Sequence, residues 1–308
     1  MAESVAQIDA PLVWVVIPTW NRRADLLECL ETVQVMGYPR FRVLVVDNAS
    51  QDSSVRAVRA HFPSVEVFPL DRNYGATGAS NVGFRHALIH NADYVLRLDS
   101  DTVVDPYLLS RLVTAAQESA DIGVLTAKIY FYHDPTLIWF AGASQHRWHF
   151  GAYNTGRYEH DALKNSHPCD VDYAWSTGML ISRSVLETTG GFDPDFLVYY
   201  EEVNFCLRVR QAGFRIRYAP TAKLWHKVGS EANNPWVAEQ WARSKMILFR
   251  KHSHGLHRLA LIGYAFAYAF LRALRPARGK GNRGPLPATL RGLVSGLRQS
   301  LSDPTELV

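Results

Sequence analysis

The stretch Tyr94-Val-Leu-Arg-Leu-Asp-Ser-Asp-Thr102 is an apolar, β-prone run that ends in two aspartates separated by one serine. Because successive residues of a strand point to opposite faces, Asp99 and Asp101 project to the same side if extended geometry continues through Ser100. Two neighbouring carboxylates suit Mg²⁺ or Mn²⁺, whose shells are completed by waters and phosphate oxygens. The alternative is a strand that runs into a solvated turn, where aspartate is common.

Strand and helix patterns alternate on the N-terminal side of this stretch and continue just beyond it. Apolar runs predict buried strands, and residues at helical spacing predict the segments between them. The predicted strands are 12–17, 41–46, 65–70 and 94–98, and Pro18 is expected to stop the first of them. The predicted helices are 22–35, 52–61, a segment that follows a Gly-rich turn at 73–81 and ends at 90, and 106–119. This order predicts an α/β, Rossmann-like fold with a mainly parallel sheet and helices on both faces.

A cluster of polar residues follows each predicted strand. The clusters are Thr19-Trp-Asn21, Asp47-Asn48, the Gly-rich 73–81 and Asp99-Ser-Asp101. Ligands of such sheets bind outside the carboxyl ends of the strands, so we expect the four clusters to converge on one edge. Loops are polar in any fold, and only the repetition in register favours a ligand site.

After Ala120 the pattern changes to short strands without intervening helices. They are predicted at 122–126, 129–132, 137–141, 148–153, 171–182 and 214–218, with a helix at 202–212 and a mobile loop at 154–170. This half is therefore predicted to be mixed and antiparallel, extending the same sheet.

Composition and charge restrict the class of protein. The chain has 308 residues, 47% of them hydrophobic, which is ordinary for a globular protein. Three cysteines without a C-x-x-C pair favour a reducing cytoplasm, and the polar segment Met1 to Pro11 lacks the pattern of a secretory signal. The net charge is +4, yet 272–298 holds seven basic residues and no acidic one, so the remainder is net negative.

Several of these stretches, in this order, resemble family 2 glycosyltransferases of the GT-A fold, and within them the bacterial rhamnosyltransferase-like branch. The resemblance spans about 12–250 and rests on the ordered set rather than on any one motif. The stretches are Val16-Ile-Pro-Thr-Trp-Asn21, Val45-Val-Asp-Asn-Ala-Ser50, Asn73-Tyr-Gly-Ala-Thr-Gly-Ala-Ser-Asn-Val-Gly83, Leu98-Asp-Ser-Asp101, Gly190-Gly-Phe-Asp193, Tyr200-Glu-Glu-Val-Asn-Phe-Cys-Leu-Arg208 and His226-Lys-Val-Gly-Ser230.

The resemblance implies a nucleotide-diphosphate-sugar donor and an inverting transfer to an acceptor hydroxyl. Physically, the carboxylate of Asp47 can accept the N3–H of uracil or thymine, and its alternative is an Asx turn. Glycine at position 75 allows the backbone to approach a nucleotide closely. The residues assigned by the resemblance to the donor are Pro18, Thr19, Asn21, Asp47, Asn73, Gly75, Asp99, Ser100 and Trp175.

The resemblance also implies a divalent cation, Mg²⁺ or Mn²⁺, on Asp101, Asp99 and His226. The cation would neutralise the charge that develops on the departing diphosphate. The family's base belongs to a Glu-Asp pair, which is Glu201-Glu202 here, so the expected base, Glu202, is one methylene longer. The alternative is that both carboxylates only favour a helix N-terminus.

The chain is predicted to divide into a catalytic domain and a tail. Residues 1–251 form the GT-A domain, with a nucleotide-binding half at 1–120 and an acceptor and catalytic half at 121–251; 252–308 form a helical basic tail. The uncharged, aromatic-rich 259–271 is too short to span a bilayer and suits a helix in the interface with anionic headgroups. Packing on the catalytic domain or in a homodimer is the alternative. A peripheral position at the inner face of the plasma membrane would bring the active site to a polyprenyl-diphosphate-linked or other saccharide acceptor.

Other classes of protein fit less well. A Rossmann oxidoreductase would carry G-x-G-x-x-G after the first strand, where Pro18-Thr-Trp-Asn21 stands, and a P-loop enzyme would carry G-K-[ST]. A nucleic-acid-binding protein would use the basic tail, but the remainder of the chain is acidic, so no nucleic-acid partner is expected. A non-catalytic partner subunit is disfavoured because the acidic motifs are retained. The favoured donor is dTDP-rhamnose, with UDP-sugars or GDP-mannose as alternatives.

Overall fold

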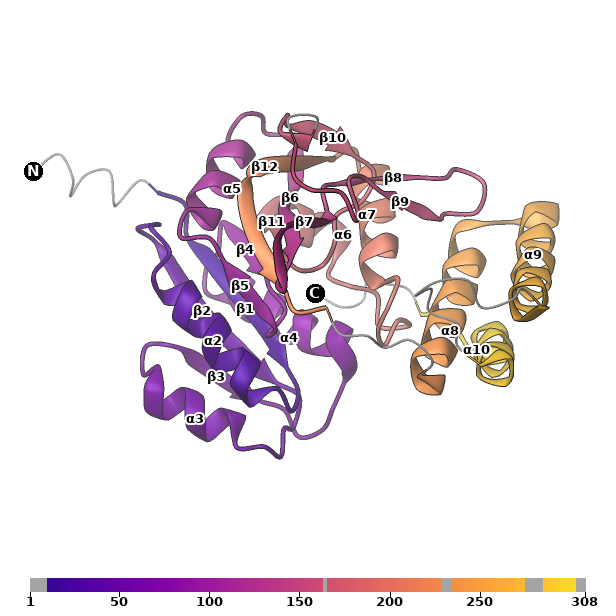
Figure 1. Cartoon of the computed structure of the whole chain (residues 1–308), viewed down its shortest axis with the longest axis horizontal. Helices are drawn as coiled ribbons and strands as arrows, with labels where there is room; N and C mark the ends of the chain where they lie inside the picture. Colours follow the sequence, from indigo (N-terminus) through magenta and orange to yellow (C-terminus); the bar gives the residue numbers. More distant parts are fainter. Residues whose placement is uncertain (1–9, 163–164, 229–233, 275–284, 303–308) are drawn as a thin grey trace, which may run out of the picture.

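The computed structural model describes residues 10–162, 165–228, 234–274 and 285–302, and a mixed sheet forms its centre (Figure 1). Ten strands of the described residues pair in this sheet, whose main path is β10-β12-β6-β11-β4-β1-β2-β3. Two residues of the His226-Lys-Val-Gly-Ser230 stretch, Gly229 and Ser230, lie outside the described residues. So do four of the seven basic residues of the tail, namely Arg275, Arg278, Lys280 and Arg283.

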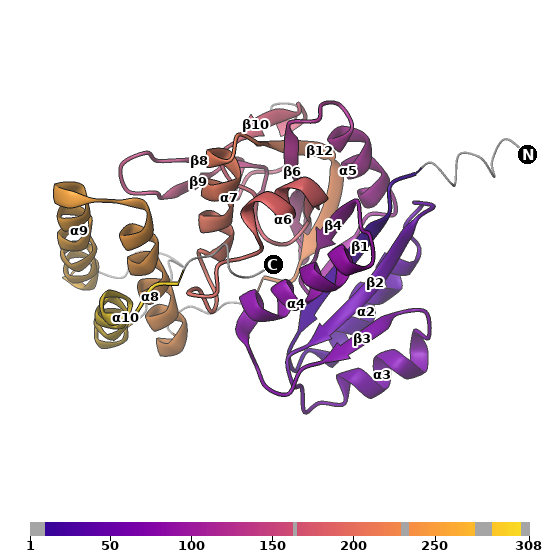
Figure 2. The ribbon, with the colours of Figure 1, turned by 180° about the vertical axis from the view of Figure 1, so that it is seen from behind.

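The N-terminal half forms the parallel part of the sheet. Strands β1, β2 and β3 pair in parallel, and β4 pairs in parallel with the other side of β1. Helices α2 and α3 lie on one face of these strands and α4 on the other (Figures 1 and 2). The elements of this half are β1 (Val13–Thr19), α2 (Arg23–Gln34), β2 (Phe41–Asp47), α3 (Ser54–His61), β3 (Glu66–Pro69), α4 (Gly75–Ile89), β4 (Tyr94–Arg97), β5 (Thr102–Val104) and α5 (Leu108–Ala116).

Two local predictions in this half were wrong. Pro18 does not stop the first strand but pairs with Val46 inside it. The pairing of β1 with β4 ends earlier, at Val16. Proline lacks a backbone N–H, and at position 18 no hydrogen bond to β4 is needed. The Gly-rich stretch is also not a turn, because α4 already begins at Gly75.

The second half extends the sheet with antiparallel pairs, as predicted. Strand β11 runs antiparallel to both β4 and β6, and β12 runs parallel to β6 and antiparallel to β5 and β10. The two strands expected at 122–126 and 129–132 are one continuous strand. The elements are β6 (Ile122–Phe131), β7 (Asp134–Phe140), β8 (Ala143–Gln145), β9 (Ala152–Asn154), β10 (Cys169–Val171), β11 (Met179–Ser182), α6 (Arg183–Thr189), α7 (Glu201–Gln211) and β12 (Arg215–His226).

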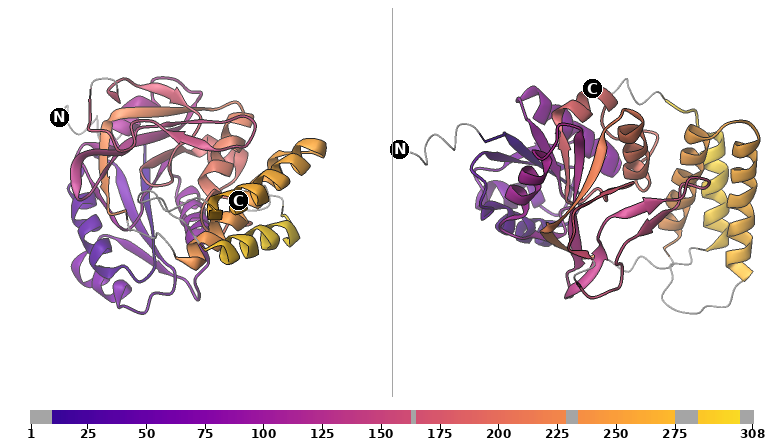
Figure 3. Two further views of the ribbon diagram at one scale, coloured as in Figure 1. Left: turned by 45° about the vertical axis from the view of Figure 1, so that its right-hand side comes forward. Right: turned by 90° about the horizontal axis from the view of Figure 1, so that it is seen from above.

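Three C-terminal helices, α8 (Pro235–His252), α9 (Gly255–Leu274) and α10 (Leu286–Arg298), pack beside the sheet domain (Figure 3). They enclose a small core of their own, formed by Ala242, Met246, Phe249, Leu261, Ala265, Ala269 and Leu293. A Cβ on Gly292 would lie 2.1 Å from the Glu239 carbonyl oxygen, so only glycine lets α10 approach α8 this closely. Helix α8 also contributes Ile247 and Leu248 to the main core and therefore belongs to both packing units.

Candidate active site

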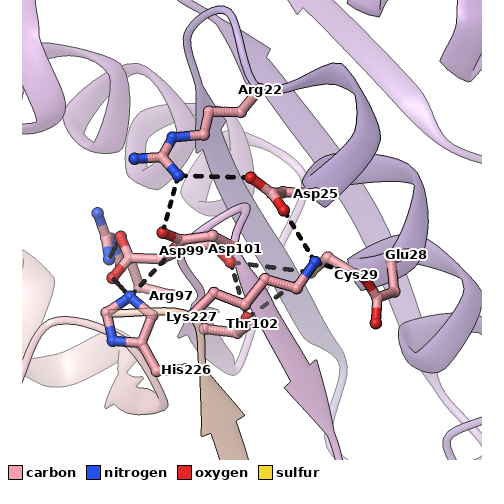
Figure 4. A network of polar contacts seen from close by, with 10 residues as sticks. All are labelled: Arg22, Asp25, Glu28, Cys29, Arg97, Asp99, Asp101, Thr102, His226 and Lys227. Atoms are coloured by element: carbon pink, nitrogen blue, oxygen red, sulfur yellow. Dashed lines mark hydrogen bonds and ion pairs between the residues drawn. The ribbon is translucent and has the colours of Figure 1, made fainter. Parts of the chain in front are cut away.

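The acidic motif after β4 does not stay extended. Ser100 and Asp101 form a turn between β4 and β5, in contrast to the strand geometry considered from the sequence. The two carboxylates nevertheless meet, because β5 pairs with β12 and sets Thr102 opposite His226. His226 Nε2 lies 3.1 Å from Asp101 Oδ1 and 3.7 Å from Asp99 Oδ2 (Figure 4).

Asp99, Asp101 and His226 form a donor set that fits a divalent cation. One ligand atom from each of the three lies within 4.8 Å of the others. Carboxylate oxygens suit Mg²⁺ and Mn²⁺, and an imidazole nitrogen adds a ligand that several transition metals accept. Among the described residues, this is the one group of three or more acidic, histidine or cysteine side chains with such spacing.

Opposite charges in this cluster stabilise one another. Burial alone would raise the pKa of Asp101, but the hydrogen bond and charge of His226 and the charge of Arg22 outweigh it and leave the pKa below its ordinary value. Burial alone would lower the pKa of His226, but Asp101 and Asp99 outweigh it and raise the pKa. A bound cation would supply positive charge next to the two aspartates, with His226 as a neutral ligand.

Cationic side chains that the sequence analysis did not single out surround the motif (Figure 4). Arg97, the last residue of β4, is 2% exposed and forms an ion pair with Asp99. Arg22 Nη1 lies 3.5 Å from Asp101 Oδ2. The backbone N–H of Lys227 donates to the Asp101 carbonyl oxygen over 3.0 Å, whereas its ammonium group forms ion pairs with Asp25 and Glu28. The signal for Arg97 was present in the sequence as a lone charge inside an apolar strand.

The predicted nucleotide-binding residues lie at the carboxyl ends of β1 and β2. Thr19 and Asp47 are cross-strand neighbours, and both are buried. Asp47 Oδ2 accepts the Ser50 N–H over 3.0 Å, whereas Asp47 Oδ1 and Thr19 Oγ1 are buried without a partner. Pro18 is buried within β1, and exposed Asn21 accepts the Gln51 N–H through its Oδ1 over 2.8 Å.

The loop after β3 joins this edge through side-chain amides. Asn73 Oδ1 accepts the Gly75 N–H over 2.8 Å, and Asn48 Nδ2 donates to the Gly75 carbonyl oxygen over 3.0 Å. Gly75 has a φ of +74°, and a Cβ there would lie 2.4 Å from the Leu197 carbonyl oxygen. Glycine at position 75 therefore permits a close approach to the backbone of Leu197. The sequence suggested a close approach to a nucleotide and did not reveal this contact.

Glu201 and Glu202 begin α7 and are both buried, at 5% and 6% exposure. The Tyr173 hydroxyl donates to Glu202 Oε1 over 3.0 Å, and Oε2 of each glutamate is buried without a partner. Burial and then the charge of Glu202 raise the pKa of Glu201 well above its ordinary value. Burial also raises the pKa of Glu202, but backbone N–H groups, the Tyr173 hydroxyl and the Glu201 side chain oppose that rise.

The glutamate pair lies close enough to the acidic motif to interact with it. The charge of Arg97 lowers the pKa of both Glu201 and Glu202, and that of Asp99 raises the pKa of Glu201. The chain enters the helix through Tyr199 and Tyr200, which both adopt positive φ, at 64° and 65°. Bulky residues rarely adopt this conformation, and such strain concentrates at functional sites.

Trp175 belongs to an aromatic group that reaches the acidic motif. Its ring is half-buried and meets the Trp139 ring edge-on at 4.5 Å between centroids, and Trp139 meets the His226 ring at 5.0 Å. Thr177, two residues further on, accepts the Asp99 N–H over 3.0 Å. The 175–177 segment therefore borders the candidate site, and Trp175 has both packed and exposed surface.

Two arginines near the C-terminal motifs have structural partners instead. Arg208 donates to the carbonyl oxygens of Thr189 and Gly191 and fixes the Gly-Gly turn. Arg243 donates to the Asp195 carbonyl oxygen over 3.2 Å. These contacts give both side chains a structural role, although Arg208 Nε and Arg243 Nη1 are buried without a partner.

Comparison with known proteins shows the family of the chain. The sequence model described as "Glycosyl transferase family 2" matches residues 14–190. The succinoglycan biosynthesis protein ExoM of Rhizobium meliloti is 28% identical over 90% of each chain. An N-acetylglucosaminyl-diphospho-decaprenol L-rhamnosyltransferase of Mycobacterium tuberculosis is 26% identical over 72% of this chain and 78% of its own.

A solved structure supports the fold. The mannosyltransferase PcManGT of Pyrobaculum calidifontis, solved with GDP-Man and Mn²⁺, superposes with a TM-score of 0.59 at 18% identity. The superposition covers 95% of this chain and 88% of that one. The predicted GT-A fold, with its parallel first half and mixed second half, is confirmed by this likeness.

Proposed function

The chain belongs to glycosyl transferase family 2, and from this premise we propose an inverting, metal-dependent transfer of a sugar from a nucleotide-diphosphate donor, with dTDP-rhamnose favoured. The acceptor is a hydroxyl of a saccharide or of a polyprenyl-diphosphate-linked saccharide in cell-envelope glycan synthesis. The observation that carries the proposal is the donor set of Asp99, Asp101 and His226, whose ligand atoms lie within 4.8 Å of one another just after β4.

We assign the donor's base to the edge formed by β1 and β2. One Asp47 oxygen is occupied by the Ser50 N–H and the other is buried and free, which suits a single N–H donor. Thymine and uracil offer one such group, N3–H, whereas guanine offers two neighbouring donors on the same edge. The free Thr19 hydroxyl adds another polar group beside it. This arrangement favours a pyrimidine nucleotide over GDP-mannose.

Asp99, Asp101 and His226 would hold Mg²⁺ or Mn²⁺ next to the diphosphate. The cation, when bound, would neutralise the negative charge of the leaving group. Arg97 holds the Asp99 carboxylate in place, and Arg22 lies on the exposed side of Asp101, where it can contact phosphate. Ser100 is buried in the turn between the two aspartates.

Glu202 is the base that takes the proton from the acceptor hydroxyl in our proposal. The two glutamates have different environments, since only Glu202 accepts the Tyr173 hydroxyl. When the environments of two neighbouring carboxyl groups move their pKa values apart, the group with the higher pKa acts as the acid and the other acts as the base. Burial raises the pKa of both carboxyl groups, but the Tyr173 hydroxyl opposes this rise at Glu202 and not at Glu201, which favours Glu202 as the base.

We place this reaction on the cytoplasmic side of the plasma membrane. Cys29, Cys169 and Cys206 are all free thiols, as expected in a reducing compartment. A relative of 26% identity carries diphospho-decaprenol in its name, and an acceptor of that class is held in a bilayer. Among the described residues, no helix has the length and hydropathy needed to cross a membrane.

A thermal-shift screen tests the donor assignment. The melting temperature is measured with dTDP-rhamnose, UDP-sugars and GDP-mannose, each with Mg²⁺, Mn²⁺ or a chelator. We expect stabilisation by dTDP-rhamnose only with the metal, and a dTDP affinity about 10- to 100-fold lower in Asp47→Asn, because a hydrogen bond to a charged group is lost.

Asp93→Asn is the matched control for this screen. Asp93 also accepts a backbone N–H, from Leu12. It lies before β4, at the end of the β1–β4 pair that is far from Asp47. No stabilisation by any nucleotide sugar would contradict the proposed function. Stabilisation by GDP-mannose alone, or equal donor affinities in Asp47→Asn and wild type, would contradict the donor and base assignments.

A further inference from the structure

The outward side of α9 is apolar along its whole length. The residues concerned recur every three or four positions and so share one face of the helix. All of them are exposed, including Leu256 at 84%, Leu259 at 65% and Leu274 at 80%. This outer face of α9 consists of Leu256, Leu259, Ala260, Gly263, Ala267, Phe270, Leu271 and Leu274.

The opposite side of α9 already has its packing partners. Leu261, Ala265 and Ala269 are buried in the core that α9 shares with α8 and α10. The helix is therefore apolar on both sides, although only one is covered within the described residues. A helix that is surrounded by water on one side normally carries polar residues there, so an uncovered apolar side indicates a contact surface.

The tip of the β8–β9 hairpin extends this surface. Trp148 lies there, 44% exposed, and its ring packs edge-on against Tyr264 of α9 at 5.6 Å between centroids. The Trp148 carbonyl oxygen is bonded to the His257 ring over 2.8 Å, which fixes the hairpin against the start of α9. Together with Leu256, the indole lines an open apolar hollow of about 600 Å³ at this junction.

The sequence of the C-terminal segment is strongly basic. Between residues 240 and 302 the sequence contains twelve Lys and Arg residues and no Asp or Glu. Arg147 flanks Trp148 at the hairpin tip, and Arg272 lies at the C-terminal end of α9. An apolar helix face in a strongly basic segment, with Arg147 beside its hairpin extension, attracts an anionic surface and repels a second copy of itself.

We propose that the outer face of α9 and Trp148 form a docking surface for an anionic lipid bilayer. The helix would lie in the plane of the headgroups, with its leucines and Phe270 among the upper acyl chains and the indole at the headgroup level. Arg147 would meet lipid phosphates. This surface would bring the enzyme to the proposed lipid-linked acceptor, and that consequence rests on the proposed function. The docking on the bilayer is independent of the proposed function.

Vesicle sedimentation of the full chain tests the docking. The vesicles contain phosphatidylglycerol and phosphatidylcholine in equal parts, or phosphatidylcholine alone, with no donor or acceptor. We expect wild type to bind the anionic vesicles, to bind neutral ones weakly, and to be released by salt. In Leu259→Glu/Phe270→Glu the partition coefficient should fall about ten-fold or more. Two apolar side chains that would contact acyl chains are replaced there by negative charges, which the anionic surface repels.

Val35→Glu/Ile89→Glu is the matched control. Val35 and Ile89 are equally exposed apolar residues, at 64% and 69%, but they lie on the sheet domain. We expect this variant to bind as wild type does. Wild type that stays in the supernatant, or an α9 variant that binds as wild type does, would overturn the proposal. Sedimentation velocity without lipid gives a further test. If wild type is a dimer there and the α9 variant is a monomer, the apolar face binds a second copy of the chain, and the proposal is overturned. Because vesicle binding is measured without substrates, a failed donor screen leaves this result unaffected.

Discussion

Replacement of Glu202 by glutamine separates the chemical step from substrate binding. The amide has nearly the size of the carboxylate, and its Oε1 can still accept the Tyr173 hydroxyl, which lies 3.0 Å from Glu202 Oε1. Glu202 is 6% exposed, so the neutral amide also avoids the cost of burying a charge. We therefore expect Glu202→Gln to fold as wild type does while lacking the proposed base.

The size of the effect follows from the role. A positioned general base contributes about 10²- to 10⁴-fold to the rate, which corresponds to about 3–5.5 kcal/mol of activation free energy. We expect kcat to fall by this factor in Glu202→Gln. Donor affinity should change by less than about two-fold, because the donor's base is assigned to Asp47 on another part of the sheet.

The assay combines transfer kinetics with calorimetric titration of the nucleotide sugar. Glu201→Gln is the matched comparison, since Glu201 is equally buried and adjacent but lacks the Tyr173 contact. We expect a smaller loss of kcat there. Wild-type turnover in Glu202→Gln would remove the base role from Glu202. A parallel loss of donor affinity and kcat would instead place this side chain in the donor site.

Two further predictions concern stability. Gly75→Ala should lower the free energy of unfolding in urea by about 2 kcal/mol or more, because φ is +74° and the new Cβ would lie 2.4 Å from the Leu197 carbonyl oxygen; an unchanged midpoint would contradict the observed approach. Glu201→Gln should gain stability over wild type as pH rises. The folded-state pKa of Glu201 is raised above 4.5, so its stability contribution is complete below that pH and is lost as pH rises through the raised value. Melting curves at several pH values that show a constant difference would refute this.

The first half of the fold could be predicted because its information is local. Each strand is an apolar run followed by a polar cluster, and in a parallel sheet the chain order alone brings those clusters to one edge. Thr19 and Asp47 are cross-strand neighbours for this reason, although they are far apart in sequence. The glycines of the 73–81 stretch indicated a turn, yet they form the start of a helix whose backbone approaches another segment.

The partners of the candidate site could not be predicted, because they come from distant segments. The Tyr173 hydroxyl reaches Glu202 across 29 positions, and His226 reaches Asp101 across 125. Nothing in the local sequence around Arg97 shows that its guanidinium meets Asp99 in a turn. The positive φ of Tyr199 and Tyr200 is equally invisible, since bulky aromatic residues normally disfavour it.

Helix α8 explains how that unusual backbone is maintained. Trp241 packs against both tyrosines, with centroid distances of 5.8 Å to Tyr199 and 4.9 Å to Tyr200. One turn further on, the Ser244 hydroxyl donates to the Val198 carbonyl oxygen over 2.9 Å. These contacts hold the segment that leads into the glutamate pair, and strain of this kind persists only where surrounding structure imposes it.

The same helix forms the core that supports α9. Met246 and Phe249 of α8 pack with Leu261 and Ala265 of α9, on the side away from its exposed face. Helix α8 thus contacts the segment before the proposed base on one side and the proposed membrane-docking helix on the other. The helical C-terminal segment is therefore part of what shapes the candidate active site, and truncating the chain after α8 would expose the core of that helix as well as remove a tail.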